Sequence, residues 1–260
     1  MTPTWNDFNL KIAAIFLPLP PFDFLSKPLL MYSMVMAKGG NLMAQELRHI
    51  EKTFPRKIIK RVLKEDPVGC PIVINREYLT SSNRIHQLYH LARYESDTGS
   101  HIAENRVIAE WGGGYGNMVV IVKRLIFKPV TYICIDTPLF VAIQWLYLST
   151  IFGPDEVNLI FRPGQKIKPQ KINLLPVSLL TKIFFKCDLF ISNWALSESS
   201  VISQKLVDRR KWFGAKHLLL GFQGKCDAFK KSERVGQMVQ RSGGFTEEIN
   251  LLPSNYYGFK

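Results

Sequence analysis

The segment Glu110–Gly116, Glu-Trp-Gly-Gly-Gly-Tyr-Gly, has the composition of a ligand-binding turn. Glycine lets a backbone turn sharply and lets a ligand approach without a Cβ in the way. The segment follows a short apolar run and precedes a helical pattern, and the first turn of a helix offers unpaired N–H groups to a polar ligand. A loop that binds nothing is the alternative, but so many glycines are costly to order.

The spacing of these glycines separates two classes of cofactor. A dinucleotide fingerprint needs Gly-x-Gly-x-x-Gly or Ala, and here its last position falls on Asn117 or Val119. A Walker phosphate loop is excluded because no Gly-Lys-Ser or Gly-Lys-Thr follows. The pattern present is Glu-x-Gly-x-Gly-x-Gly, which begins at Glu110. It is similar to the first motif of Rossmann-like methyltransferases, which bind S-adenosylmethionine.

A second acidic residue, Asp136, ends the next apolar run, Thr131 to Ile135. A carboxylate at that position can accept hydrogen bonds from both hydroxyls of an adenosine ribose. Nicotinamide enzymes use the same device, so Asp136 alone does not choose between the cofactors and the glycine spacing does. A nicotinamide oxidoreductase would be favoured again only by NAD binding that Asp136→Ala abolishes.

Strands and helices must alternate to position these groups. The predicted strands are Val107–Trp111, Thr131–Asp136, Val157–Phe161, Ile172–Val177, Leu189–Ser192 and Lys216–Phe222. The predicted helices between them are Asn117–Phe127, Pro138–Phe152 and Ser197–Phe213. The strands are apolar on both faces, which is typical of a mainly parallel sheet with helices on both sides. We therefore expect an α/β, Rossmann-like core.

Two features of this sheet stay open at the level of sequence. Either Val157–Phe161 or Ile172–Val177 is the third core strand, and we favour the second because one short helix leads from it into the next strand. The segment Tyr256–Phe259 could close the sheet as a last antiparallel strand.

The first hundred residues have a different pattern. Residues 1 to about 30 are rich in Pro and Phe without a clear period, so we assign them no structure. The predicted helices are Asn41–Phe54, Pro55–Glu65 and one capped by Ser82 or Asn83 that runs to Tyr94, with an extended run at Pro71–Asn75 and a linker over 95–105. We expect residues 1–100 to form a helical cap and residues 101–260 to form the cofactor-binding domain.

The net charge of +13, from 34 basic and 21 acidic residues, would attract polyanions such as nucleic acid or an anionic membrane surface. The basic residues are scattered, however, and the densest cluster, residues 56–61, is interrupted by two isoleucines. That cluster fits an amphipathic helix with a solvated face better than a basic arm. Specific nucleic-acid binding is therefore possible but not favoured.

Cysteine spacing and hydropathy indicate the compartment. None of Cys70, Cys134, Cys187 and Cys226 stands at a Cys-x-x-Cys spacing, so no metal site or redox motif is suggested and a reducing, cytoplasmic setting is expected. The sequence contains no stretch of about 20 apolar residues, so it predicts no transmembrane helix. The apolar run Ile12–Leu19 is interrupted by prolines and lacks a basic start, unlike a signal peptide.

The glycine turn and the segment Ser192–Glu198 together resemble a family of sugar O-methyltransferases found mostly in bacteria. The other matching pieces are Ile135–Pro138 and Ile172–Val177, and the resemblance covers about residues 75–225. It implies S-adenosylmethionine as the cofactor and a sugar or glycan hydroxyl as the acceptor. The cofactor-binding residues that it implies are Glu110, Gly112, Gly113, Gly114, Tyr115, Gly116, Asp136, Pro176 and Asn193.

A hydroxyl acceptor benefits from a general base. Glu198 is the first candidate because it follows the strand that ends near the reactive side of the cofactor, although it could equally be a solvated first-turn carboxylate. His86 is the second; together with His90 it could act as a base, contact a sugar or bind a metal, or both could simply pack. The segment Tyr78–Arg93 is the expected acceptor surface.

Alternatives to this function remain at the level of sequence. The acceptor could be a small metabolite, a protein or RNA, and the basic charge keeps RNA in consideration. A module that binds the cofactor without catalysis is the alternative outside enzymes. Trp111, Tyr115 and Trp194 could stack on a sugar or adenine, or pack in the core. The oligomeric state does not follow from the sequence.

Overall fold

The strands that carry the predicted site belong to one sheet in the computed structural model, which describes residues 1–34, 41–250 and 252–260. The strand bounds are β1 Val107–Trp111, β2 Thr131–Asp136, β3 Val157–Leu159, β4 Ile172–Pro176, β5 Leu189–Asn193, β6 His217–Gln223, β7 Phe245–Glu248 and β8 Asn255–Phe259. The sheet order within these residues is β3-β4-β2-β1-β5-β6-β8-β7. All pairs from β3 to β6 are parallel, and β8 is antiparallel to both β6 and β7.

The predicted α/β, Rossmann-like class is confirmed by this topology. Strand β4 pairs directly with β2, with Asp136 opposite Pro176, so the preference for Ile172–Val177 as the third core strand is correct. Strand β8 closes the sheet as expected. Sequence reasoning did not anticipate β7 or the helix before it, α10 (Arg234–Arg241).

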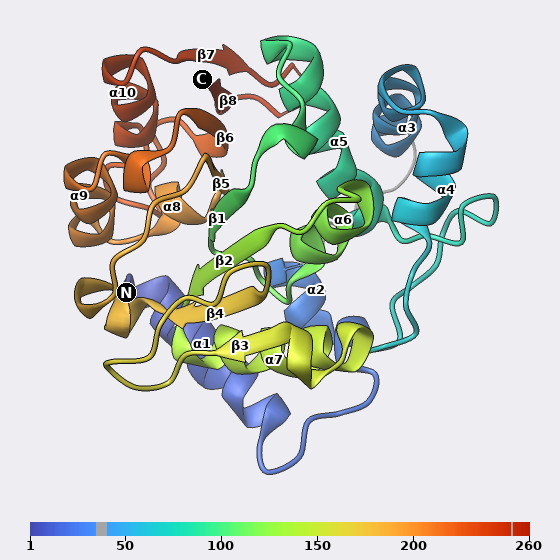
Figure 1. The fold of residues 1–260 in the computed structure, drawn as a ribbon, viewed down its shortest axis with the longest axis horizontal. Helices are drawn as coiled ribbons and strands as arrows, with labels where there is room; N and C mark the ends of the chain where they lie inside the picture. The colour runs from blue at the N-terminus through green and yellow to red at the C-terminus, as the bar shows by residue number, and fades with distance from the viewer. Residues whose placement is uncertain (35–40, 251) are drawn as a thin grey trace.

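Strand residues alternate between two apolar cores, one on each face of the sheet. On β2, Tyr132 and Cys134 face the first core, whereas Ile133 and Ile135 face the second. Helices α5 (Ser82–Thr98), α6 (Asn117–Leu125) and α7 (Pro138–Phe152) cover the first core. Helices α9 (Val201–Arg209) and α10 cover the second, on the left of Figure 1. None of the helices in the described ranges is long and apolar enough to cross a lipid bilayer.

The N-terminal region is helical from its start, and the assignment of no structure to residues 1–30 is wrong. Its helices are α1 (Pro3–Phe16), α2 (Pro28–Met34), α3 (Asn41–Thr53) and α4 (Arg56–Leu63). In α1, Trp5, Phe8, Ile12 and Phe16 pack into the first core at helical spacing, although the frequent Pro and Phe residues obscured that period. Proline at position 3 is tolerated because the first turn of a helix needs no N–H donor there.

Three other local predictions need correction. The predicted helix Ser197–Phe213 is interrupted: α8 (Ala195–Glu198) ends before Ser199, and Ser200 caps α9. Helix α5 is capped by Ser81 and runs to Thr98, so it takes up the start of the expected linker. The run Pro71–Asn75 forms only an isolated bridge from Asn75 to Thr80 and joins no strand of the sheet.

Candidate functional site

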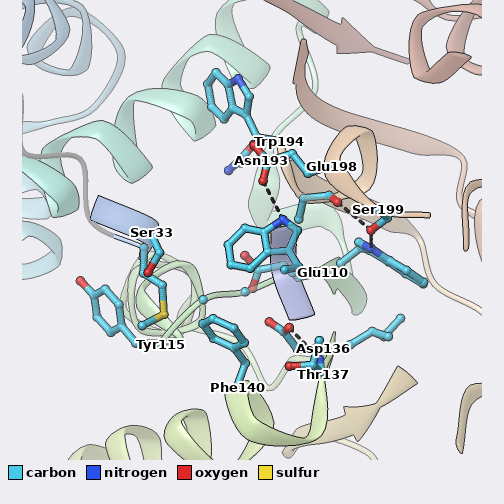
Figure 2. A pocket seen from close by; sticks show the side chains of 18 of the residues that line it. Ser33, Glu110, Tyr115, Asp136, Thr137, Phe140, Asn193, Trp194, Glu198 and Ser199 are labelled. Atoms are coloured by element: carbon cyan, nitrogen blue, oxygen red, sulfur yellow. Dashed lines mark hydrogen bonds between the residues drawn. The ribbon is translucent and has the colours of Figure 1, made fainter. Parts of the chain in front are cut away.

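A cavity of about 630 Å³ lies at the carboxyl ends of β1, β2, β4 and β5. The ends of these strands contribute Trp111, Asp136, Val177 and Asn193 to its wall. Figure 2 shows side chains that follow different strands gathered around this one cavity. Further lining residues come from helices α1, α2 and α5, from the glycine turn after β1, from the helices that follow the strands, and from Leu252 and Asn255. The carboxyl edge of a doubly wound sheet is where such folds bind ligands.

Residues 112–115 of the glycine turn line the floor of this cavity, whereas Gly116 does not line it and packs against Leu148. Gly112, Gly114 and Gly116 have left-handed backbone, with φ of 78°, 57° and 102°. A Cβ on Gly112 would lie 2.0 Å from the Cβ of Ala195. Any larger residue at position 112 would therefore push β1 and α8 apart and deform the cavity.

Gly113 and Tyr115 complete the turn. A Cβ on Gly113 would lie 2.4 Å from the Sγ of Cys134, so this glycine allows the turn to fold over β2. Tyr115 lines the cavity but is otherwise buried, with its ring edge-on to Tyr147. Its hydroxyl accepts a hydrogen bond of 3.0 Å from Asn83 of α5, which joins the turn to the N-terminal helices.

Two carboxyl groups flank the turn, of which Glu110 is buried and Asp136 is half-buried. The Oε2 of Glu110 accepts a 2.9 Å hydrogen bond from the Tyr132 hydroxyl. The carboxylate of Asp136 accepts from the backbone N–H of Thr137 at 2.7 Å and from the Gln144 side chain at 3.0 Å. Burial raises the pKa of each acid, Glu110 and Asp136, to about 7, because desolvation outweighs these hydrogen bonds. Both acids therefore change charge near neutral pH.

Pro176 and Asn193 lie at the ends of two further strands. Pro176 is buried in β4 opposite Asp136, and the cavity is lined by the two residues that follow it, Val177 and Ser178. Asn193 lines the cavity and donates to Gln87 of α5 at 3.3 Å. Its Oδ1 is buried without a hydrogen-bond partner among the described residues.

Glu198 reaches the cavity, but its carboxylate is engaged on both oxygens. Oε2 accepts from the Trp5 indole at 3.0 Å, and Oε1 accepts from Gln223 at 2.7 Å. Burial raises the pKa of Glu198, and those two donors oppose the rise. At the other side of the cavity, Asn9 accepts from the Thr137 hydroxyl at 2.9 Å. Helix α1 is thus fastened beside the carboxyl ends of β2 and β5 (Figure 1).

His86 lines the cavity from α5, and its ring is held from behind. Its Nδ1 lies 2.6 Å from the Oε1 of Glu46 in α3, and both side chains are at most 7% exposed. A carboxylate at Nδ1 favours the tautomer with the proton on Nδ1. The opposite nitrogen, Nε2, is then a proton acceptor. The ring also stacks near Trp194, with centroids 6.0 Å apart.

His90, one helical turn after His86, lies outside the cavity. It is buried, and its Nδ1 lies 2.7 Å from the Tyr257 hydroxyl. Burial, followed by the neighbouring His86, holds its pKa well below the usual value, so the ring is neutral. No group of three or more His, Cys, Asp or Glu side chains that could hold a metal occurs in the part of the chain that the structure describes.

Sequence reasoning missed Trp5 and Glu46, the partners of the two candidate bases. Glu46 is 40 residues from His86 and lies on a different helix, so no local spacing links them. Trp5 lies in the segment to which no structure was assigned. Only the folding of the N-terminal helices over the sheet brings these residues to the cavity.

Neither a protein-family model nor the sequence of a curated protein matches this chain. Solved structures with a similar fold include the mitomycin 7-O-methyltransferase (TM-score 0.43, 12% identity, covering 84% of this chain and 66% of that one). Another is a pyocyanin biosynthetic protein (TM-score 0.43, 13% identity, covering 68% of this chain and 57% of that one). A third is an O-methyltransferase family protein from Burkholderia thailandensis (TM-score 0.37, 12% identity, covering 100% of this chain and 84% of that one). The chain spans less than two thirds of the first two, and at these identities the likeness concerns the path of the chain alone.

Proposed function

We propose that the protein is an S-adenosylmethionine-dependent O-methyltransferase that acts on a sugar or glycan hydroxyl. The observation that carries the proposal is the glycine turn Gly112–Gly116, which lies between the acids Glu110 and Asp136 on the floor of a 630 Å³ cavity. When bound, the cofactor supplies an electrophilic methyl group that leaves its sulfur for an acceptor oxygen. The chain must therefore bind the cofactor, place the hydroxyl in line and take up its proton.

The residues around the cavity fit this cofactor. The carboxylate of Asp136 lines the cavity and accepts from Thr137 on one oxygen and from Gln144 on the other, and a carboxylate is the acceptor that two ribose hydroxyls need. Asn193 Oδ1 and Asn117 Nδ2 are buried in residues of the cavity wall without described partners. They offer an acceptor and a donor to the amino-acid part. The turn has no Cβ at Gly114 to hinder its approach.

His86 is the group that we assign as general base. With Nδ1 held by Glu46, Nε2 can accept the proton of the acceptor hydroxyl while Glu46 stabilises the imidazolium that forms. Glu198 fits this role less well because both of its oxygens already accept N–H donors. We assign Glu198 to holding α1 over the cavity.

The acceptor end of the cavity has groups that suit a polyol. Gln87 and Asn255 offer amide donors and acceptors, and Trp194 offers a flat apolar ring. These side chains come partly from α5, which supports the proposal that residues 1–100 act as a cap that selects the acceptor. The four cysteines are free thiols, which supports a reducing, cytoplasmic setting.

Cofactor affinity should depend on pH through Asp136. Its pKa of about 7 means that the carboxylate, the form that accepts two ribose hydroxyls, is a minority at pH 6 and the majority at pH 8. We expect the Kd for S-adenosylmethionine to fall by roughly tenfold between these pH values. Calorimetric titration of wild type and Asp136→Asn checks this. The variant should bind S-adenosylmethionine more weakly by about 1–3 kcal/mol at pH 8, and its Kd should change little between pH 6 and pH 8.

The matched control for this prediction is Glu110→Gln. Burial raises the pKa of Glu110 to about 7 as well, so the control separates the contributions of the two acids to the pH dependence. An Asp136→Asn variant that keeps wild-type affinity and slope would exclude the ribose role of Asp136.

The acceptor class is tested by incubating the protein with methyl-labelled S-adenosylmethionine and separate saccharide, RNA and protein pools. Label in the saccharide pool is the expected result. Label in the RNA pool, with salt-sensitive binding, would replace the sugar acceptor and keep the methyltransferase activity. Cofactor binding with no label in any pool would favour a non-catalytic module.

A further inference from the structure

We infer that helix α4 and the adjoining loop 71–79, together named the α4 surface, dock onto an anionic lipid surface. Figure 1 shows α4 and this loop projecting at the right edge of the molecule, away from the N-terminus and α1. None of these residues lines the cavity at the strand ends. The inference is therefore independent of the proposed enzymatic activity.

The charge of the α4 surface is strongly positive. Arg56, Lys57, Lys60 and Lys64 are exposed, and no acidic residue occurs from position 56 to 64. Residues 48–80 include eight basic and four acidic side chains. Two of those acids, Glu65 and Asp66, are committed to ion pairs with the buried Arg84. The exposed side of α4 thus carries several cations that the surrounding acids do not neutralise.

Apolar side chains are exposed beside these cations. Ile72, Val73 and Ile74 follow one another in the projecting loop and are 49%, 47% and 41% exposed. Phe127 lies along α4 with 75% exposure, and the Arg61 guanidinium is 3.8 Å from its ring centroid. Neighbouring exposed apolar groups mark interaction sites more often than single ones do.

The loop is anchored to the rest of the molecule at its second half. Tyr78 is buried and donates to Glu51 at 2.7 Å, and Glu77 pairs with Arg56 at 2.6 Å. Asn75 and Thr80 close the loop by backbone pairing. Ile72–Ile74 are about half exposed and belong to neither apolar core of the sheet.

Cations together with exposed aliphatic groups are the chemistry that binds an anionic membrane. Basic side chains are attracted to anionic headgroups, while apolar side chains enter the boundary with the acyl chains. Nucleic acid would also be attracted by the charge, but single strands need aromatic stacking platforms, and the exposed apolar residues of this loop are aliphatic. Elsewhere on the described surface, single exposed aromatic rings lie beside cations, as Phe161 does beside Arg162 and Phe184 beside Arg210, whereas the α4 surface adds three consecutive exposed aliphatic residues.

The experiment is co-sedimentation of the full chain with vesicles of phosphatidylcholine alone and of phosphatidylcholine mixed with phosphatidylglycerol. We expect binding to the mixed vesicles that decreases with salt. The variants Lys57→Glu/Lys60→Glu and Ile72→Ser/Ile74→Ser should each weaken it by tenfold or more. The matched controls, Lys182→Glu/Lys186→Glu and Phe184→Ser, change exposed residues elsewhere and should bind like wild type.

Several outcomes would overturn the inference. They are equal binding to both vesicle types, equal loss in the control variants, or no vesicle binding together with tight binding to an RNA oligonucleotide. Calorimetric titration of S-adenosylmethionine into the same variants reports on the cavity. A variant that binds S-adenosylmethionine like wild type but no longer binds vesicles is folded and has lost only the function of the α4 surface.

Discussion

Arg84→Met should destabilise the protein by about 3–5 kcal/mol, because it leaves a buried acid without its partner. The Arg84 side chain is fully buried and lies 2.9 Å from Glu65 and 3.3 Å from Asp66. The guanidinium also donates to Asn117 of α6 and Tyr147 of α7. One side chain thus joins α5 to the two helices that follow the strands β1 and β2.

Denaturant unfolding measures this change as a shift of the midpoint at constant slope. The matched control is Arg56→Met, which removes an ion pair with Glu77 whose side chains are 70% and 49% exposed. Exposed pairs contribute less than about 1 kcal/mol. The double variant Arg84→Met/Glu65→Gln should recover part of the loss because it removes the stranded charge. If Arg84→Met costs no more stability than Arg56→Met, Arg84 does not anchor α5 to α6 and α7 as described.

His86→Ala should lower kcat for methyl transfer to the saccharide pool by roughly 10²–10⁴-fold, the usual contribution of a general base. Its affinity for S-adenosylmethionine should stay close to that of wild type, because the role assigned to His86 is toward the acceptor. Rates at saturating cofactor, measured beside calorimetric titration, separate the two effects.

Two further variants distinguish the candidate bases. Glu46→Gln keeps the packing but removes the charge behind the ring, so it should lower kcat less than His86→Ala and shift the pH–rate profile. Glu198→Gln should have the smallest effect on kcat, since the two carboxylate oxygens of Glu198 already accept hydrogen bonds from Trp5 and Gln223. A full rate in His86→Ala together with a lost rate in Glu198→Gln would reverse the assignment.

The sheet could be predicted from sequence because each core strand is a continuous apolar run between clear turn signals. The bounds of β1 and the α7 helix agree with the prediction to the residue. The same signal fails where packing decides the outcome. Trp212 and Phe213 adopt left-handed backbone and end the predicted helix early, because their rings enter the second core.

The candidate site was predictable where its residues follow strand ends. Glu110, Asp136 and Asn193 all line one cavity because parallel strands end at a common edge. The contact between Glu46 and His86 was not predictable, since it depends on how α3 packs on α5. The same holds for Trp5, whose contact with Glu198 spans 193 positions. Long-range contacts of this kind have no local signature in the sequence.

The most direct test of the central claim is calorimetric titration of the wild-type protein at pH 8 with S-adenosylmethionine, S-adenosylhomocysteine and NAD. We predict micromolar binding of the first two at one site per chain and no comparable binding of NAD. A folded protein that binds neither sulfur compound, or that binds NAD instead, would contradict the assignment of the glycine turn and Asp136 to S-adenosylmethionine.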